Sequence, residues 1–298
     1  MDIEQSIEKL KEIFGVEVYK GTRTYKGTNQ DYIIAKWLPV WSKNLAENYQ
    51  KVKNGLKINE LKDKHKGKPC ICIGLGVSVE KEIENIKKIK NSVIIVANRA
   101  YRICIANGIK PDYVMIFDSH QERYKDFKGC PKNIPLITHH SMNPKVLEGW
   151  DKVYYFRMWH PGIQFFDSVL PAIYPDIDCF PNLGSVGNSM VVFANYIGCK
   201  PIVLIGYDLK YVDGKYRADD YERVGNKWKR VSNEQTDAER KQSAVMYNGE
   251  MTENVMITYK NALERLYKTN FLHIIDCSNG ILDLPKMKLS EAIKEFRL

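Results

Sequence analysis

The chain has 298 residues, a net charge of +9 and a hydrophobic fraction of 44%. This length suits one large domain, or one domain with an extension, and the composition is typical of a globular protein with a sizeable core. No apolar run approaches the ~20 residues that span a bilayer, and the acidic N-terminus lacks the features of a signal peptide. We therefore expect a cytoplasmic protein without a transmembrane segment. The basic residues are not interleaved with aromatic ones, which argues against nucleic acid as a partner.

The seven cysteines are odd in number and form no pair of CxxC motifs. This pattern indicates reduced, buried thiols rather than disulfides or a zinc site. Cys70 and Cys72 alternate along one apolar segment, and we expect their side chains to lie on opposite faces of a strand.

Residues 1–66 are expected to form a helical N-terminal extension packed on the main domain. Apolar residues between 3 and 14 recur at helical spacing. Residues 37–41 are expected to form an aromatic loop with a proline, and 44–61 a lysine-rich helix.

Residues 67–298 alternate between apolar strands and amphipathic helices, which predicts an α/β, Rossmann-like, mostly parallel sheet with helices on both faces. The expected strands are 69–74, 93–97, 113–117, 135–138, 153–156, 201–205 and 272–275. The expected helices are 79–89, 100–107, 190–197 and 255–267. Residues 211–250 are polar, charged and aromatic, and this length is typical of a lid-like insertion or a partly mobile loop.

A glycine-rich loop follows the first strand of the expected sheet. Gly74 and Gly76 would let the backbone approach a phosphate, and Ser78 begins a helix whose N-terminus offers free N–H groups. A tight turn that binds nothing would have the same sequence, because the loop lacks the third glycine of the dinucleotide motif and the lysine of a P-loop.

Polar residues also follow the next two strands, at the sheet edge where open α/β folds bind ligands. Asn98 and Arg99 are candidate nucleotide contacts, although a surface arginine would look the same. Asp118 is a candidate for Mg²⁺, for a ribose hydroxyl or for a loop cap. His120 is a candidate base.

Three further histidines follow later strands. Of the adjacent His139 and His140, at most one is expected to face the cleft, and His160 lies beside a proline. Each could act as a base near neutral pH or serve only a structural role.

A second glycine cluster precedes the helix expected at 190–197. Its glycines, hydroxyl and amide suit an anionic or sugar-like group, and the residues are Gly184, Ser185, Gly187 and Asn188. Asp208 ends the strand at 201–205 and gives the sheet a second carboxylate at a strand end.

From about Lys68 to Asp283 the order of these blocks resembles the motility accessory factor and 6-hydroxymethylpterin diphosphokinase-like domain family. The blocks are Gly74–Ser78, Gly108–Asp112 followed by Asp118, Gly184–Ser189 followed by Gly198–Pro201, Gly206–Leu209, Gly249–Thr252 and Ser278–Gly280. Val77 replaces the proline that is usual in the first block.

The resemblance implies a fold similar to bacterial sialyltransferases that use CMP-sialic acid. It also implies that Gly76, Ser78, Asn98 and Asp118 line the donor site, which Gly187 and Asn188 approach. Those enzymes place a histidine base before the late helix, and this chain has no histidine between 160 and 273.

Three functions therefore stay open. The first is a nucleotide-dependent transferase, most specifically a glycosyltransferase that uses a CMP-activated nonulosonic acid, with Asp118 or His120 as base and Asp208 bound to sugar or metal. The second is an ATP- and Mg²⁺-dependent diphosphokinase with Asp118 and Asp208 as metal ligands. The third is a non-catalytic module that binds a nucleotide or glycan. The sequence leaves the acceptor and the oligomeric state open.

Overall fold

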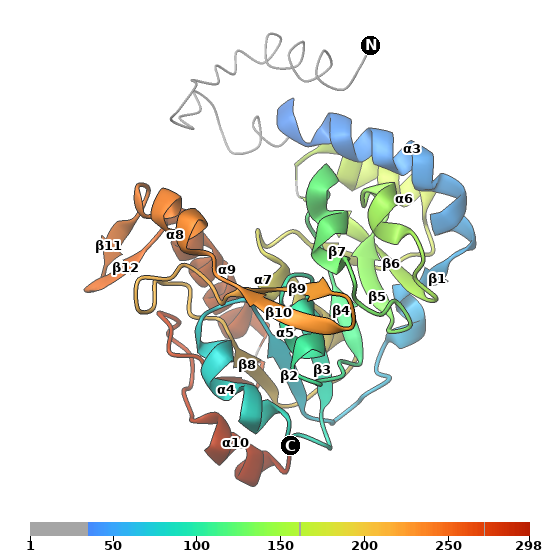
Figure 1. Ribbon diagram of the computed structural model, residues 1–298. Coiled ribbons are helices and arrows are strands. Elements are labelled where there is room, and N and C mark those ends of the chain that lie inside the picture. The colour runs from blue at the N-terminus through green and yellow to red at the C-terminus, as the bar shows by residue number, and fades with distance from the viewer. Residues whose placement is uncertain (1–34, 161, 271) are drawn as a thin grey trace.

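The computed structural model describes residues 35–160, 162–270 and 272–298. A central parallel sheet runs in the order β1-β6-β5-β4-β3-β2-β8-β13, and β7 pairs with β6. The strands of this sheet are β1 (Leu56–Lys57), β2 (Cys70–Ile73), β3 (Val93–Ala97), β4 (Tyr113–Met115), β5 (Leu136–His139), β6 (Val153–Trp159), β7 (Cys179–Pro181), β8 (Ile202–Ile205) and β13 (Ile274–Asp276). The predicted α/β Rossmann-like fold is confirmed (Figure 1).

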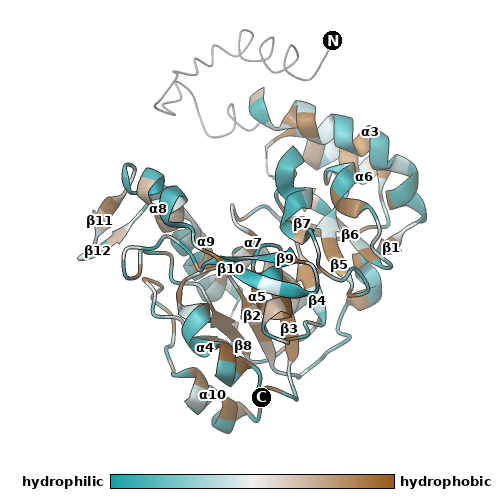
Figure 2. Cartoon of the chain, in the orientation of Figure 1, coloured by the Kyte–Doolittle hydropathy of each residue, from teal (hydrophilic) through white to brown (hydrophobic). Residues whose placement is uncertain are grey.

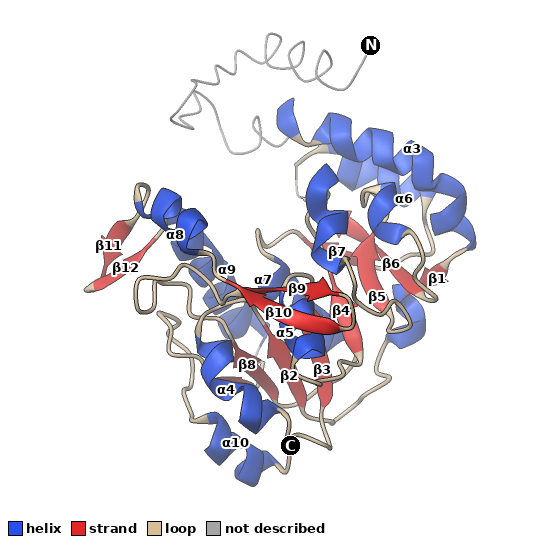
Figure 3. Cartoon of the chain, viewed as in Figure 1, coloured by secondary structure: helices blue, strands red, loops and turns tan. Residues whose placement is uncertain are grey.

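Helices surround the sheet, as Figure 3 shows. They are α3 (Leu38–Asn54), α4 (Ser78–Ile86), α5 (Ala100–Ala106), α6 (Leu170–Ile173), α7 (Val186–Tyr196), α8 (Glu234–Lys241), α9 (Asn254–Asn270) and α10 (Leu289–Phe296). Shorter turns of helix are η1 (Ile58–Leu61), η2 (Gln121–Phe127), η3 (Pro144–Leu147) and the π-helical η4 (Phe165–Val169). None of the described helices is long and apolar enough to cross a membrane.

The central strands are buried on both faces, which explains their almost continuous apolar sequence. All residues of β2, β3 and β8 are buried, and Figure 2 shows these strands as the hydrophobic centre of the molecule. The register is continuous across them, since Ile71 pairs with both Ile94 and Val203.

Part of the N-terminal prediction is wrong. Residues 37–41 are not a loop, because α3 begins at Leu38 with a proline in its first turn, where the missing N–H of proline costs no hydrogen bond. The helix expected to continue to residue 61 ends at Asn54, and β1 and η1 follow it. The helix expected within residues 3–14 lies outside the described residues.

The cysteines are free, and five of the seven are buried. The expectation that Cys70 and Cys72 face opposite ways is wrong: their Sγ atoms lie 4.0 Å apart. Side chains two positions apart in a strand share a face, and this rule decides the arrangement.

The segment 211–250 is folded rather than an irregular loop. It contains the hairpin β9 (Asp220–Val224) and β10 (Lys227–Val231), then α8, then β11 (Val245–Tyr247), which pairs with β12 (Glu250–Thr252). The first hairpin is hydrophilic and lies across α5 (Figure 2). Whether this insertion moves as a lid stays a prediction.

Candidate functional site

The first glycine-rich loop is bonded to the neighbouring loop after β8. The N–H groups of Gly74 and Gly76 donate to the carbonyl oxygens of Ile205 and Gly206, at 2.7 and 2.8 Å. The N–H of Ser78 donates to Asp208 Oδ2 at 2.8 Å. The expectation that these three amides are free to hold a phosphate is therefore wrong in this conformation.

Glycine is needed at position 76 because the two loops approach so closely. A Cβ there would overlap the carboxylate of Asp208 and the carbonyl of Gly206. The glycine pattern thus has a structural cause that the sequence could not distinguish from ligand binding. A ligand contact of Gly74, Gly76 or Ser78 stays a prediction.

Asp208 itself occupies the place predicted for an anionic ligand. Its side chain is 1% exposed and accepts from the first turn of α4, where the helix dipole favours a negative charge. A carboxylate in this position stabilises the start of α4. Its Oδ1 has no hydrogen-bond partner within the described structure, and the catalytic and metal-binding roles predicted for this buried carboxylate stay predictions.

The second glycine cluster is likewise tied into the fold. Ser185 caps α7 by accepting from the N–H of Asn188 at 3.2 Å. The buried Asn188 side chain donates to the carbonyls of Leu183 and Tyr259, and so links the turn to α9. Gly184 has a φ of +83°. Gly187 lies against the ring of Tyr207, whose hydroxyl donates to its carbonyl at 2.8 Å. Nucleotide contacts of these residues stay a prediction.

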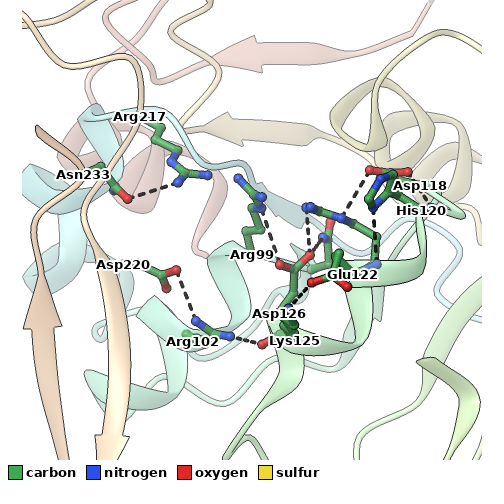
Figure 4. A network of polar contacts seen from close by, with 12 residues as sticks. Arg99, Arg102, Asp118, His120, Glu122, Lys125, Asp126, Arg217, Asp220 and Asn233 are labelled. Atoms are coloured by element: carbon green, nitrogen blue, oxygen red, sulfur yellow. Dashed lines mark hydrogen bonds and ion pairs between the residues drawn. The ribbon is translucent and has the colours of Figure 1, made fainter. Parts of the chain in front are cut away.

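Residues after β3 and β4 form a different kind of surface, which we call the arginine cluster. It pairs three arginines with three carboxylates at the carboxyl edge of the sheet and includes a fourth arginine beside them (Figure 4). Its members are Arg99, Arg102, Arg123, Arg217, Asp118, Asp126 and Asp220.

Asp126 is the centre of the cluster. Its carboxylate accepts from Asn98 Nδ2 at 2.6 Å and lies 3.5 Å from Arg99 Nε and 3.4 Å from Arg123. Burial raises the pKa of Asp126, and the two arginines oppose that rise. Burial lowers the pKa of Arg99, and Asp126 opposes that change. These groups are partly withdrawn from water. Opposite charges attract more strongly in such a partly buried place than at an open surface.

Asp118 and His120 lie at the exposed rim of the cluster. Asp118 is 3.4 Å from Arg123 Nε and accepts from the backbone N–H of His120 at 2.9 Å. His120 caps η2 by accepting from the N–H of Glu122 at 3.3 Å. Of the predicted site residues, Asn98, Arg99, Asp118 and His120 are therefore brought together, whereas Asp208 belongs to the closed loop pair.

The insertion, residues 211–250, also contributes side chains to the cluster. Arg217 comes from the insertion, and its guanidinium donates to the amide oxygen of Asn233 at 3.1 Å rather than to a carboxylate. Leu75, Arg99, Arg217, Ala218 and Asp220 line a narrow crevice that has no room for a water molecule in this conformation. Five members of the cluster were not among the site residues predicted from the sequence, namely Arg217, Arg102, Arg123, Asp126 and Asp220. The polar, aromatic composition of 211–250 was the only sequence signal that pointed to the first of these.

Hydrogen bonds hold the insertion over the first loop. The N–H of Ala218 donates to Leu75 O at 3.0 Å, and the N–H of Asp219 donates to Glu80 on α4 at 2.6 Å. Arg230 on β10 contacts Glu80 and lies 2.9 Å from Asp219. The insertion is thus attached to the first turn of α4 by backbone bonds and ion pairs together.

The histidines after β5 are interior residues. His139 and His140 are both 0% exposed, and His139 Nε2 lies 3.1 Å from Ser119 Oγ. Burial lowers the pKa of His139 to about 4 and that of His140 well below its ordinary value. Both belong to the core, in agreement with the structural role that was one of the two alternatives left open by the sequence.

Comparison with protein families gives one match, to the family described as 6-hydroxymethylpterin diphosphokinase MptE-like, over residues 43–214. The chain belongs to this family. A search among curated proteins finds no match for this MptE-like chain.

Three solved structures align with this chain, and the first of them shares its fold. The Maf glycosyltransferase from Magnetospirillum magneticum AMB-1 aligns with 97% of this chain and 48% of its own, at 17% identity and a TM-score of 0.59. The MptE-like chain thus spans about half the length of that protein. The sialyltransferase CstII from Campylobacter jejuni, solved with cytidine-5′-monophosphate, aligns with 71% of this chain and 80% of its own, at 14% identity and a TM-score of 0.37. A CST-II structure with a trisaccharide acceptor and CMP aligns with 70% and 80%, at 17% identity and 0.35.

A diphosphokinase reaction would need Mg²⁺, so the candidate ligands of the MptE-like chain can be tested for fit. Among the described residues, no group of three or more His, Cys, Asp or Glu side chains is placed to hold a metal ion. Asp118 is exposed and could supply one oxygen beside substrate phosphates, as magnesium sites often require, whereas Asp208 is buried. The predicted pair of Asp118 and Asp208 does not fit a shared, open magnesium site.

Proposed function

We propose that this MptE-like protein is a nucleotide-dependent transferase whose phosphate-binding centre is the arginine cluster. The observation that carries the proposal is the crevice shared by Arg99 and Arg217. The buried Nε–H groups of Arg102 and Arg217 have no hydrogen-bond partner within the described structure. Because unpaired buried donors are costly, an anionic oxygen would be favoured beside them once the crevice, too narrow for a water molecule in this conformation, widens.

The first candidate reaction is transfer of a nonulosonic acid from its CMP-activated form. An acceptor hydroxyl would attack the anomeric carbon, the bond to the CMP phosphate would break, and the guanidinium groups would stabilise the negative charge on the departing phosphate. His120 or Asp118, at the rim, would accept the proton of the hydroxyl. This candidate is supported by the shared fold of the solved Maf glycosyltransferase.

The second candidate is transfer of diphosphate from ATP to a pterin alcohol, as the description of the family names it. The same arginines would hold the ATP phosphates, and Asp118 would contribute one ligand to Mg²⁺. The two candidates differ in the nucleotide and in the need for the metal.

Isothermal titration calorimetry with CMP, and with ATP in the presence and absence of Mg²⁺, separates them. For the first candidate we expect CMP binding that is independent of Mg²⁺ and that weakens about tenfold or more in Arg99→Ala and in Arg217→Ala. Arg265→Ala, on an exposed face of α9, is the matched control and should bind as wild type does.

Turnover is then measured as release of CMP from CMP-N-acetylneuraminic acid, with and without an acceptor hydroxyl compound. ATP binding that requires Mg²⁺ would replace the first candidate with the second. CMP binding without turnover on any donor would support the non-catalytic module. Binding that is insensitive to both arginine variants would refute the arginine cluster as the phosphate site.

A further inference from the structure

A second groove lies on the other side of the first loop, between α4 and α10. The two helices pack beside each other (Figure 1), and the groove between them and the end of β13 has a volume of about 560 Å³. A volume of this size suits a small ligand. Its lining includes Ser78, Asp276, Ser278, Lys81, Lys286 and Lys288.

The groove has an unsatisfied polar side chain in its lining. Asp276 is 0% exposed, and its Oδ1 accepts from the N–H of Ser278 at 2.8 Å, but its Oδ2 has no partner. The hydroxyl of Ser78, which is 7% exposed, is also without a partner. Buried polar atoms are usually paired, and these two residues both line the groove, so a ligand group that enters it could supply the missing partners.

The charges around the groove indicate what that ligand is. A buried carboxylate oxygen requires an N–H or O–H donor. The rim carries three lysines and also Glu82 and Glu291, and Ser78 lies at the positive end of α4. A bare cation would meet the lysines unfavourably, whereas a molecule with an N–H donor at one end and an anionic group at the other would match both parts.

We propose that this groove is a second small-molecule site, which takes a nucleotide with its amino-bearing base toward Asp276 and its phosphate toward Lys81 and Lys288. The site is separate from the arginine cluster and does not depend on the function proposed for it. A base with an oxygen in place of the amino group would present an acceptor to the Asp276 carboxylate, and we expect the groove to reject it.

Two matched pairs of nucleotides test this discrimination by calorimetry. CMP and UMP carry an amino group and an oxygen, respectively, at position 4 of the base, and AMP and IMP do so at position 6. In the double variant Arg99→Ala, Arg217→Ala, where the cluster no longer contributes, we expect the amino-bearing member of at least one pair to bind about tenfold or more tightly. Equal affinities within both pairs would overturn the proposal.

Variants within the groove locate the binding. Asp276→Asn should bring the two members of that pair to within about twofold of each other, and Lys288→Ala should weaken both about threefold to tenfold. Lys294→Ala, an exposed lysine elsewhere on α10, is the control and should change neither. Should Asp276→Asn not fold, Ser78→Ala and Lys288→Ala still decide the result.

The remaining outcomes are also decisive. Binding of Mg²⁺ or Ca²⁺ alone that is lost in Asp276→Asn would mean a cation site and would overturn the proposal. Nucleotide binding in the double arginine variant that is weakened by Lys288→Ala supports it, even if the arginine cluster proves to bind nothing. Failure of the groove and failure of the arginine cluster are therefore distinguishable.

Discussion

Asp276 is expected to make the stability of the protein depend on pH. Burial raises its pKa to about 6 from an ordinary value of 3.8, the nearby Asp208 adds to the rise, and the N–H of Ser278 and the charge of Lys286 oppose it. Between these two pH values the folded protein keeps a proton on Asp276 that the unfolded chain has already released. The contribution of Asp276 to stability is therefore lost as the pH rises through this range.

The size of the effect follows from the two pKa values. At about 1.4 kcal/mol for each pKa unit, the difference between 3.8 and about 6 corresponds to about 3 kcal/mol. Asn in place of Asp276 keeps an oxygen for the N–H of Ser278 but carries no charge at any pH. The free energy of unfolding of Asp276→Asn should therefore gain about 3 kcal/mol on that of wild type between pH 3.5 and pH 7.

Urea unfolding followed by tryptophan fluorescence at several pH values measures this difference. Asp151→Asn, at an exposed position, is the control and should follow the wild-type curve. A difference between Asp276→Asn and wild type that stays constant over the range would refute the reasoning. It would mean that Asp276 meets water or a counter-charge when the chain is folded.

Three further changes test the loop contacts. Gly76→Ala should lower the free energy of unfolding by about 2–3 kcal/mol, because the new methyl group would collide with Asp208. Gly249→Ala is the control and should lower it by about 1 kcal/mol, since a Cβ there meets no other atom. Equal losses in urea titrations would contradict the close approach of the two loops at Gly76. Asn188→Ala removes two buried hydrogen bonds and should cost about 2–3 kcal/mol in the same titrations, so a loss below about 0.5 kcal/mol would count against its bridging role. Glu80→Gln should speed amide hydrogen exchange in residues 216–224 more than in α9, and unchanged exchange would show that the ion pairs do not hold the insertion.

The central sheet was predictable because its strands are buried on both faces. Such strands are almost wholly apolar, as in β2, β3 and β8, and the amphipathic helices between them require parallel pairing. The hairpin β9–β10 was not predictable in the same way. Its residues are mostly exposed or half-buried, so little hydrophobic periodicity marks it.

The candidate site likewise contains residues that could be placed from the sequence and residues that could not. Asn98, Arg99, Asp118 and His120 could be placed together from the sequence, because each follows a strand of one parallel sheet and the carboxyl ends of such strands meet at one edge. Arg217 could not, since it reaches that edge only when the insertion folds back over the first loop. The amino-acid sequence by itself thus determined the buried central strands, the helices that alternate with them, and the edge at which the candidate site lies, but not the short strands β1 and β7.

The tertiary structure alone decided which polar groups at that edge are already paired. A glycine-rich loop before a helix presents the same free amides to a phosphate or to a carboxylate of the protein, and nothing local distinguishes the two. Here Asp208, 130 residues away along the chain from Ser78, takes the amide at the start of α4. The arginines gather instead beside β3, where long-range packing pairs Arg99, Arg102 and Arg123 with three carboxylates.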